Sequence, residues 1–207
     1  MPAIPRESLL SLEQYARERA NFRQRVLDHK RHRVLALGPH VTLLFEDELT
    51  VRYQIQEMLR IEKTFEEEGI LDELHAYGPL VPDGTNLKAT MLIEYEDAEE
   101  RARELLQLAG IEREVFLRVG GRPPRAAIAD EDMDRTEGGK TSAVHFLRFE
   151  LEPGEIADFH AGLPVSVSIR HPHYQASVDP LPEAVQSALA KDFRPGTPIT
   201  DLGSGRS

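Results

Sequence analysis

The sequence predicts an α+β fold in which a mixed or antiparallel sheet packs with three to four amphipathic helices. Short aliphatic runs between turn signals outnumber the stretches in which apolar residues recur at helical spacing. Strands and helices do not alternate strictly, which disfavours a doubly wound parallel sheet. The chain has 207 residues and 40% hydrophobic content, enough for one core. Residues 1–193 are therefore expected to form a single α+β domain with a basic N-terminal helix, and residues 194–207 a disordered tail.

Four longer helices are expected, each with an apolar stripe and a start or stop signal. Asp47 can cap the second helix, and Gly69 is its expected C-terminal stop. Asp97, with Glu100 three residues later, resembles a capping box that starts the third. The expected helices span residues 6–33, 47–68, 97–110 and 182–193, and a shorter one follows Pro153 and Gly154.

Strands are expected where runs of β-branched or aliphatic residues lie between glycine, proline or polar clusters. These runs are residues 41–46, 89–95, 114–119, 143–151, 165–170 and 174–178. Residues 78–84 are rich in glycine and proline and predict a stiff turn. Residues 120–141 show no sustained period, so they predict a long loop of the kind that is usually functional or disordered.

Composition excludes several functional classes. No run of 18 apolar residues occurs and the first residues do not resemble a signal peptide, so a soluble, cytoplasmic protein without a membrane partner is expected. The chain has no cysteine, which removes disulfides, thiolate metal sites and thiol nucleophiles. A net charge of −11 argues against general nucleic-acid binding, because binding to phosphates is driven by lysine and arginine.

The basic residues are concentrated near the N-terminus. Residues 1–40 hold eight basic and four acidic side chains, whereas the rest of the chain is strongly acidic. One interpretation is a basic helix that lies on an acidic body, and the other is an arm that binds an anionic partner. The partner-binding candidates, in this helix and in the 78–88 loop, are Arg23, Arg25, Lys30, Arg31, Pro82 and Asp83.

Glu62 is the first candidate for a buried polar site. On a helix from Asp47, it falls in the middle of an apolar arc formed by Val51, Ile55, Met58, Leu59 and Phe65. A buried carboxylate must be paired, hydrogen-bonded, metal-bound or protonated. Gln56, Arg60 and His171 complete this candidate site. The alternatives are an ordinary salt bridge from Glu62 to an arginine, and a solvated face for Gln56 and Arg60.

Two histidines continue the apolar faces of predicted strands. If those strands are neighbours, His145 and His171 come close, and with Glu62 they would form a site of two histidines and one carboxylate that suits iron, manganese or zinc. The alternative is a pair of core histidines that are hydrogen-bonded to the backbone. The chain contains no nucleophile elbow, no zinc-protease helix and no dinucleotide fingerprint.

Several blocks of sequence together resemble a bacterial family, domain-of-unknown-function family 3501. The blocks are Phe45-Glu46, residues 54–60, 77–84, 88–94 and 140–149, and the resemblance spans residues 5 to 193. It implies no catalytic role. The family pattern has glutamine and asparagine where this chain has His145 and His173, so a metal site that uses either would be peculiar to this sequence. His171 and Glu62 match the pattern.

The resemblance also implies a redox setting, because genes of this family often lie beside those of a rubrerythrin-like protein and of an iron–sulfur protein related to heterodisulfide reductase. We therefore expect a non-enzymatic accessory or binding protein without a cofactor, which serves such a redox or peroxide-defence system. One alternative is an enzyme that depends on iron, manganese or zinc. Another is a homo-oligomeric structural protein.

Overall fold

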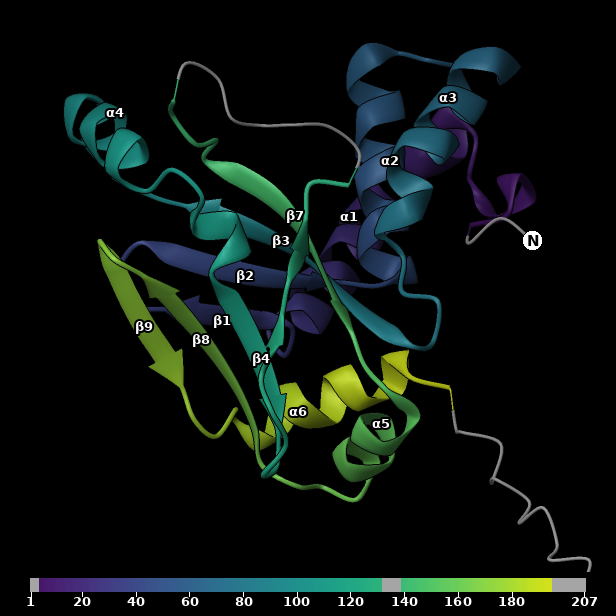
Figure 1. Cartoon of the computed structure of the whole chain (residues 1–207). Coiled ribbons are helices and arrows are strands. Elements are labelled where there is room, and N and C mark those ends of the chain that lie inside the picture. The colour runs from purple at the N-terminus through teal and green to yellow at the C-terminus, as the bar shows by residue number, and fades with distance from the viewer. Residues whose placement is uncertain (1–3, 132–138, 195–207) are drawn as a thin grey trace, which may run out of the picture.

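A computed structural model of the chain describes residues 4–131 and 139–194 and confirms the α+β class (Figure 1). The described part contains six α-helices and two antiparallel sheets. The helices are α1 (Leu12–Lys30), α2 (Glu48–Glu62), α3 (Glu67–Tyr77), α4 (Ala98–Gln107), α5 (Pro153–His160) and α6 (Glu183–Leu189). The strands are β1 (Val34–Leu37), β2 (Val41–Glu46), β3 (Asn86–Ile93), β4 (Val115–Val119), β5 (Arg125–Ala126), β6 (Ile128–Ala129), β7 (Val144–Glu150), β8 (Val165–His171) and β9 (Tyr174–Val178). None of these helices is long and apolar enough to cross a membrane.

The two sheets face each other and enclose the main core (Figure 1). The first sheet has the order β1-β2-β3-β7-β6 and the second β5-β4-β8-β9. Alternate residues of each strand point inward, so buried and less buried positions follow one another along β3, β4 and β7. The chain passes from one sheet to the other at Ala127, between β5 and β6, and at the opposite edges the Tyr174 hydroxyl of β9 donates to the Leu37 carbonyl of β1 at 2.5 Å. The result is a barrel-like sandwich.

Helices α1, α2 and α3 form a second apolar cluster beside the first sheet (Figure 1). Its buried members are Ile4, Leu9, Val51, Ile55, Leu59 and Ile70. Ser11 begins α1 with a capping box and Asp47 caps α2, as predicted for Asp47. This cluster lies outside the core between the sheets, and it brings α1 against α2.

The predicted boundary of α2 is wrong. The helix ends at Glu62, because Lys63 adopts a left-handed conformation with φ 57° and Thr64 N–H donates to the Leu59 carbonyl at 2.9 Å. A new helix, α3, starts at Glu67, and Gly69 lies inside it rather than stopping the earlier one.

Three further differences concern regions without a clear sequence signal. The segment predicted as helix over 6–33 begins as a short 3-10 turn, and its helix, α1, spans only Leu12–Lys30. The predicted loop 120–141 contains the two short strands β5 and β6, and residues 132–138 lie outside the described part. Of the predicted tail, only Arg194 is described. The single-domain assignment stays a prediction.

A buried arginine ties the N-terminal half to the C-terminal end. Arg33 is 1% exposed and donates to the carbonyl oxygens of Phe45 at 2.9 Å and Glu46 at 3.0 Å. Its guanidinium also pairs with Asp192, just after α6, and lies 3.5 Å from Asp47. Burial raises the pKa of the Asp192 carboxyl, and the hydrogen bond and charge of Arg33 oppose that rise.

Candidate functional site

Glu62, the residue expected to be buried, is exposed. The prediction assumes that the helix continues through Phe65, so that the residues before and after Glu62 on its helical face are apolar and buried. Because α2 ends at Glu62, Phe65 does not lie on the same helical face, and its exposed fraction is 74%. The neighbouring Ile61 is 62% exposed. The buried stripe of α2 is narrower and is centred on Ile55.

The acid that α2 directs inward is Glu57. Its Oε1 accepts from the Tyr15 hydroxyl at 2.6 Å and from Arg19 Nε at 2.7 Å, and its Oε2 accepts from Arg19 Nη2 at 2.8 Å. These hydrogen bonds, chiefly those from Arg19, lower the pKa of Glu57 to about 2. Arg60, a predicted site residue, is exposed and lies 3.7 Å from Glu57. The arrangement is an ion pair between α1 and α2, and no pattern in the sequence distinguishes Glu57 from the neighbouring charged residues.

Gln56 is buried as predicted, but its partner is the backbone. Its Oε1 accepts from Leu10 N–H at 2.7 Å, and its Nε2 donates to the Leu10 carbonyl at 3.4 Å. Gln56 therefore fixes the segment before α1 onto α2, in the way that buried amides satisfy loop backbone. Its side chain is committed to this structural contact.

His171 is also buried, and backbone groups satisfy both ring nitrogens. Its Nδ1 accepts from His173 N–H at 3.3 Å, so Nε2 carries the proton and donates to the Ala109 carbonyl at 3.2 Å. His171 is therefore a core histidine that is hydrogen-bonded to the backbone, which was the alternative to a metal ligand. His171 lies in the second sheet, whereas His145 lies in the first sheet and Glu62 at the end of α2. Among the residues 4–131 and 139–194, no three His, Asp or Glu side chains are grouped so as to hold a metal ion.

His145 is fully enclosed and belongs to a polar network between the sheets. Its Nδ1 lies 2.5 Å from Asp130 Oδ2, and its Nε2 lies 3.0 Å from the Ser142 carbonyl oxygen and 2.8 Å from Thr141 Oγ1. The Thr141 hydroxyl in turn donates to Glu112 at 3.3 Å. Asp130 adopts a positive φ of 49°, a conformation that non-glycine residues rarely take outside such a constraint.

An Asp–His–Thr arrangement has the residue types of a nucleophilic triad, but the direction of its hydrogen bonds does not fit. The Ser142 carbonyl can only accept, so His145 Nε2 carries a proton and is not free to take one from Thr141. Thr141 is also only 1% exposed, which closes it to a substrate. These observations favour a structural role for the network.

The partner-binding candidates of α1 lie on its outer surface. Arg23, Arg25 and Arg31 are exposed and Lys30 is half-buried, with the Arg25 guanidinium 4.9 Å from the centre of the Phe22 ring. In the turn before β3, Pro82 is half-buried, and Asp83 accepts from Thr85 N–H at 2.9 Å and from its hydroxyl at 2.8 Å. Their role in binding a partner stays a prediction.

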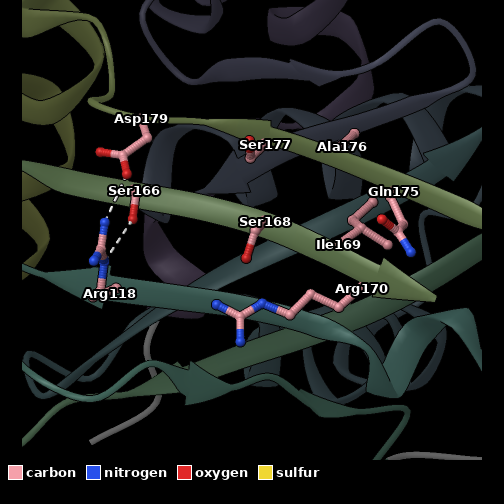
Figure 2. A pocket seen from close by; sticks show the side chains of 9 residues that line it. All are labelled: Arg118, Ser166, Ser168, Ile169, Arg170, Gln175, Ala176, Ser177 and Asp179. Carbon is pink, nitrogen blue, oxygen red and sulfur yellow. Dashed lines mark hydrogen bonds and ion pairs between the residues drawn. The ribbon is translucent and has the colours of Figure 1, made fainter.

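The outer face of the second sheet carries a polar groove of about 450 Å³ (Figure 2). Serines and arginines from β4, β8 and β9 occupy the alternate positions that point away from the core. The groove is lined by Arg118, Ser166, Ser168, Ile169, Arg170, Gln175, Ala176, Ser177 and Asp179. The small serine side chains leave the sheet surface hollow between the longer arginines, and we call this feature the serine groove.

The two arginines of the serine groove have different surroundings. Arg118 donates to Asp179 at 2.6 Å and to Ser166 at 3.2 Å. Arg170 lies with its guanidinium carbon 5.0 Å from the centre of the Phe116 ring, and its side chain has no acidic partner or hydrogen bond within the described part. Figure 2 shows its guanidinium directed back along β8 towards Arg118, with Ser168 beside it. Two like charges thus share one exposed face, with one acid among the lining residues.

The sequence contained a signal for the serine groove, although no site was predicted there. Ser166, Ser168 and Arg170 alternate with the apolar Val165, Val167 and Ile169, which is the pattern of a half-exposed strand. Polar residues on such a face usually meet only solvent, so the pattern alone does not indicate a binding surface. The pairing of β8 with β4 and β9 brings the two arginines onto one face.

The comparisons with known proteins agree with the family expected from the sequence blocks. Residues 3–193 match the family described as protein of unknown function (DUF3501). The chain is also similar to a crystal structure of a protein of unknown function from Burkholderia pseudomallei K96243. The two share 52% sequence identity over 93% of this chain and 100% of the other, with a TM-score of 0.88. No curated protein matches the chain.

Proposed function

This chain belongs to domain-of-unknown-function family 3501, whose description states no activity, and we propose that it is a non-enzymatic accessory protein that binds an acidic segment of a partner protein in the serine groove. The observation that carries the proposal is the position of Arg170. Its guanidinium has five N–H donors and no acidic partner among the described residues, and the Phe116 ring holds its plane beside the groove.

Charge complementarity favours a carboxylate-rich occupant. Arg118 is paired with Asp179, whereas the Arg170 guanidinium has no acidic partner among the described residues, so a carboxylate beside Arg170 would accept bidentate hydrogen bonds. The hydroxyls of Ser168 and Ser177 and the amide of Gln175 offer further donors to an extended backbone or side chain. An open polar groove on a sheet suits a protein segment better than a small apolar ligand, which needs an enclosed apolar cavity.

The partner that we propose is the iron–sulfur or rubrerythrin-like protein implied by the family resemblance. The resemblance supports this through gene association alone. The His145 network offers no accessible nucleophile with a free base beside it, and this supports an accessory role over an enzymatic one.

Fluorescence anisotropy with a labelled glutamate-rich peptide tests the groove. Arg170→Glu is expected to weaken binding by a factor of roughly ten or more, and added salt should weaken binding to the unchanged protein. Arg103→Glu, on the exposed face of α4, makes the same change in net charge away from the groove and is the matched control. Equal affinity for the two variants would remove the groove as the binding site.

Co-purification tests the partner. The tagged chain and its Arg170→Glu variant are each mixed with the rubrerythrin-like and iron–sulfur proteins of the same organism, and only the unchanged chain is expected to retain one of them. The metal-dependent enzyme stays a prediction, which elemental analysis after exposure to iron, manganese and zinc would check. The homo-oligomer also stays a prediction, and light scattering would check it.

A further inference from the structure

A second pocket, of about 290 Å³, lies between the end of α3 and the outer face of the first sheet. Its walls are mainly apolar and include Ala76, Pro79, Leu80 and the ring of Phe146. Lys88, in the middle of the central strand β3, contributes the amine of this pocket. We call this the Lys88 pocket. It is on the opposite sheet from the serine groove.

Lys88 has acidic neighbours, but their carboxylate oxygens accept hydrogen bonds from other groups. Glu46, its cross-strand neighbour on β2, accepts from the hydroxyls of Thr50 at 2.5 Å and Thr90 at 2.6 Å. Asp83 accepts from the backbone and hydroxyl of Thr85.

The carboxylates on the other side of Lys88 are paired with Arg148. Arg148, the neighbour of Lys88 on β7, holds Glu131 with two hydrogen bonds of 2.8 and 2.9 Å and also pairs with Glu150. The Lys88 amine forms no ion pair or hydrogen bond with any described residue, although the residue is half-buried. An amine in this position is costly for a fold unless it serves something else.

The surroundings shift the titration of the Lys88 amine towards lower pH. Burial lowers the pKa of Lys88, and the nearby positive charge of Arg148 lowers it further, against the opposing charges of Glu131, Asp83 and Glu150. His75, at the end of α3, is the remaining titratable group of the pocket. A neutral lysine amine is a nucleophile towards carbonyl carbon, and desolvation by apolar walls is a known way to produce it.

We propose that Lys88 binds a small aldehyde or ketone with an apolar substituent, as an imine in this pocket. The amine nitrogen attacks the carbonyl carbon, and the carbonyl oxygen takes a proton to give a carbinolamine. This loses the hydroxyl as water, with a proton from nitrogen, and leaves a carbon–nitrogen double bond. One amine and one carbonyl compound give one imine and one water, so no oxidant or reductant is needed. The apolar substituent would lie against Leu80 and Phe146.

A carboxylate ligand fits the pocket less well. Glu131, Glu150 and Asp83 lie near Lys88 and outnumber the two cations Lys88 and Arg148, so an added anion meets a negative surrounding. The guanidinium of Arg148 is also already used by Glu131 and Glu150. A neutral carbonyl compound avoids both costs.

Reductive trapping tests the proposal on the full chain. The protein is treated with isovaleraldehyde and cyanoborohydride near neutral pH, and peptide mapping follows the mass added at each lysine over time. Lys88 is expected to react at least about threefold faster than the exposed Lys63, Lys140 and Lys191, although it is less accessible than they are. Lys30 and the α-amino group are resolved separately by the same map.

Two variants distinguish the pocket from general reactivity. Lys88→Arg keeps the positive charge and should remove the fast phase of labelling, whereas Lys191→Arg should leave it unchanged. Phe146→Ala opens the wall to water and should slow Lys88 labelling, with circular dichroism as the check on folding. Glyoxylate, which is charged, should show no preference for Lys88.

The proposal is overturned if Lys88 reacts no faster than the exposed lysines, or if glyoxylate prefers it as strongly as isovaleraldehyde does. The proposed function is independent of this result, because Arg170→Glu changes the other sheet and should leave the labelling of Lys88 as it is. Failure of peptide binding in the serine groove would likewise leave the trapping experiment valid.

Discussion

The Arg19 guanidinium holds both carboxylate oxygens of Glu57, with Nε 2.7 Å from Oε1 and Nη2 2.8 Å from Oε2. The Tyr15 hydroxyl, on a fully buried side chain, donates to the same carboxylate. This three-residue contact fastens α1 to α2 at the edge of their apolar cluster. Its strength decides how firmly the N-terminal helix is attached to the rest of the fold.

Glu57→Gln is expected to destabilise the protein, by about 1 to 2 kcal/mol, because it removes the charge that Arg19 and Tyr15 face while leaving both in place. The Arg19 side chain is one-third exposed, so solvent screens the pair and the expected loss of unfolding free energy is small for a charged pair. Glu62→Gln makes the same change on an exposed residue of the same helix and should stay within about 0.5 kcal/mol. Urea unfolding of the two variants measures the difference, and equal losses would contradict the assignment of Glu57 as the inward acid.

The same carboxylate predicts a pH dependence. The pKa of Glu57 is lowered in the folded state from its ordinary value of 4.5 to about 2, so its contribution to stability is full above 4.5 and is lost as the pH falls towards 2. The free energy of unfolding of the unchanged protein should therefore fall more between about pH 5 and pH 3 than that of Glu57→Gln. Parallel curves for the two proteins over this range would show that the pairing with Arg19 does not persist in solution.

Arg33→Met is expected to be severely destabilising, by about 3 to 5 kcal/mol, since it leaves the buried Asp192 carboxylate and two carbonyl oxygens without their donor. Arg31→Met, two residues earlier and exposed, is the control and should have little effect. Thermal unfolding of both variants gives the comparison. A melting temperature for Arg33→Met close to that of the control would mean that Asp192 has another partner in solution.

Thr141→Val is expected to cost about 1 to 3 kcal/mol, because the methyl group that replaces the hydroxyl removes the buried donor to Glu112 Oε2 and one of the two contacts of His145 Nε2. Ser142→Ala, next to it, keeps the backbone carbonyl that His145 bonds and removes only a local hydroxyl contact, so it should be nearly neutral. Denaturant unfolding distinguishes the two. A stable Thr141→Val protein would indicate that the network serves something other than the fold.

Local signals predicted most of the elements. Asp47 and Asp97 cap their helices through bonds to Thr50 and Glu100 N–H, because a cap is decided by residues three positions apart. The strands followed from their apolar runs. The end of α2 was missed because a lysine rather than a glycine takes the left-handed position there. Strand β1 was missed because its four residues follow a long helical pattern directly.

The site residues were less predictable, since they depend on how distant segments pair. The burial of Glu62 depends on a helix that runs to residue 68, but α2 ends at Glu62 itself. Glu57 instead meets α1 through tertiary contacts with Tyr15 and Arg19. His145 and His171 were correctly placed on inward faces, but they belong to different sheets. No local pattern states which strands are neighbours, and this pairing decides whether two side chains meet.

The bond between Arg33, just before the first strand, and Asp192, in the last helical turn, joins residues that lie 159 positions apart in the chain. During synthesis, Arg33 emerges from the ribosome long before Asp192 does. A nascent chain that stops short of residue 192 therefore lacks one of the two carboxylates, Asp47 and Asp192, that lie beside Arg33. We therefore expect the first sheet to reach its full stability only when translation is almost finished, and incomplete products to be more open to cellular proteases.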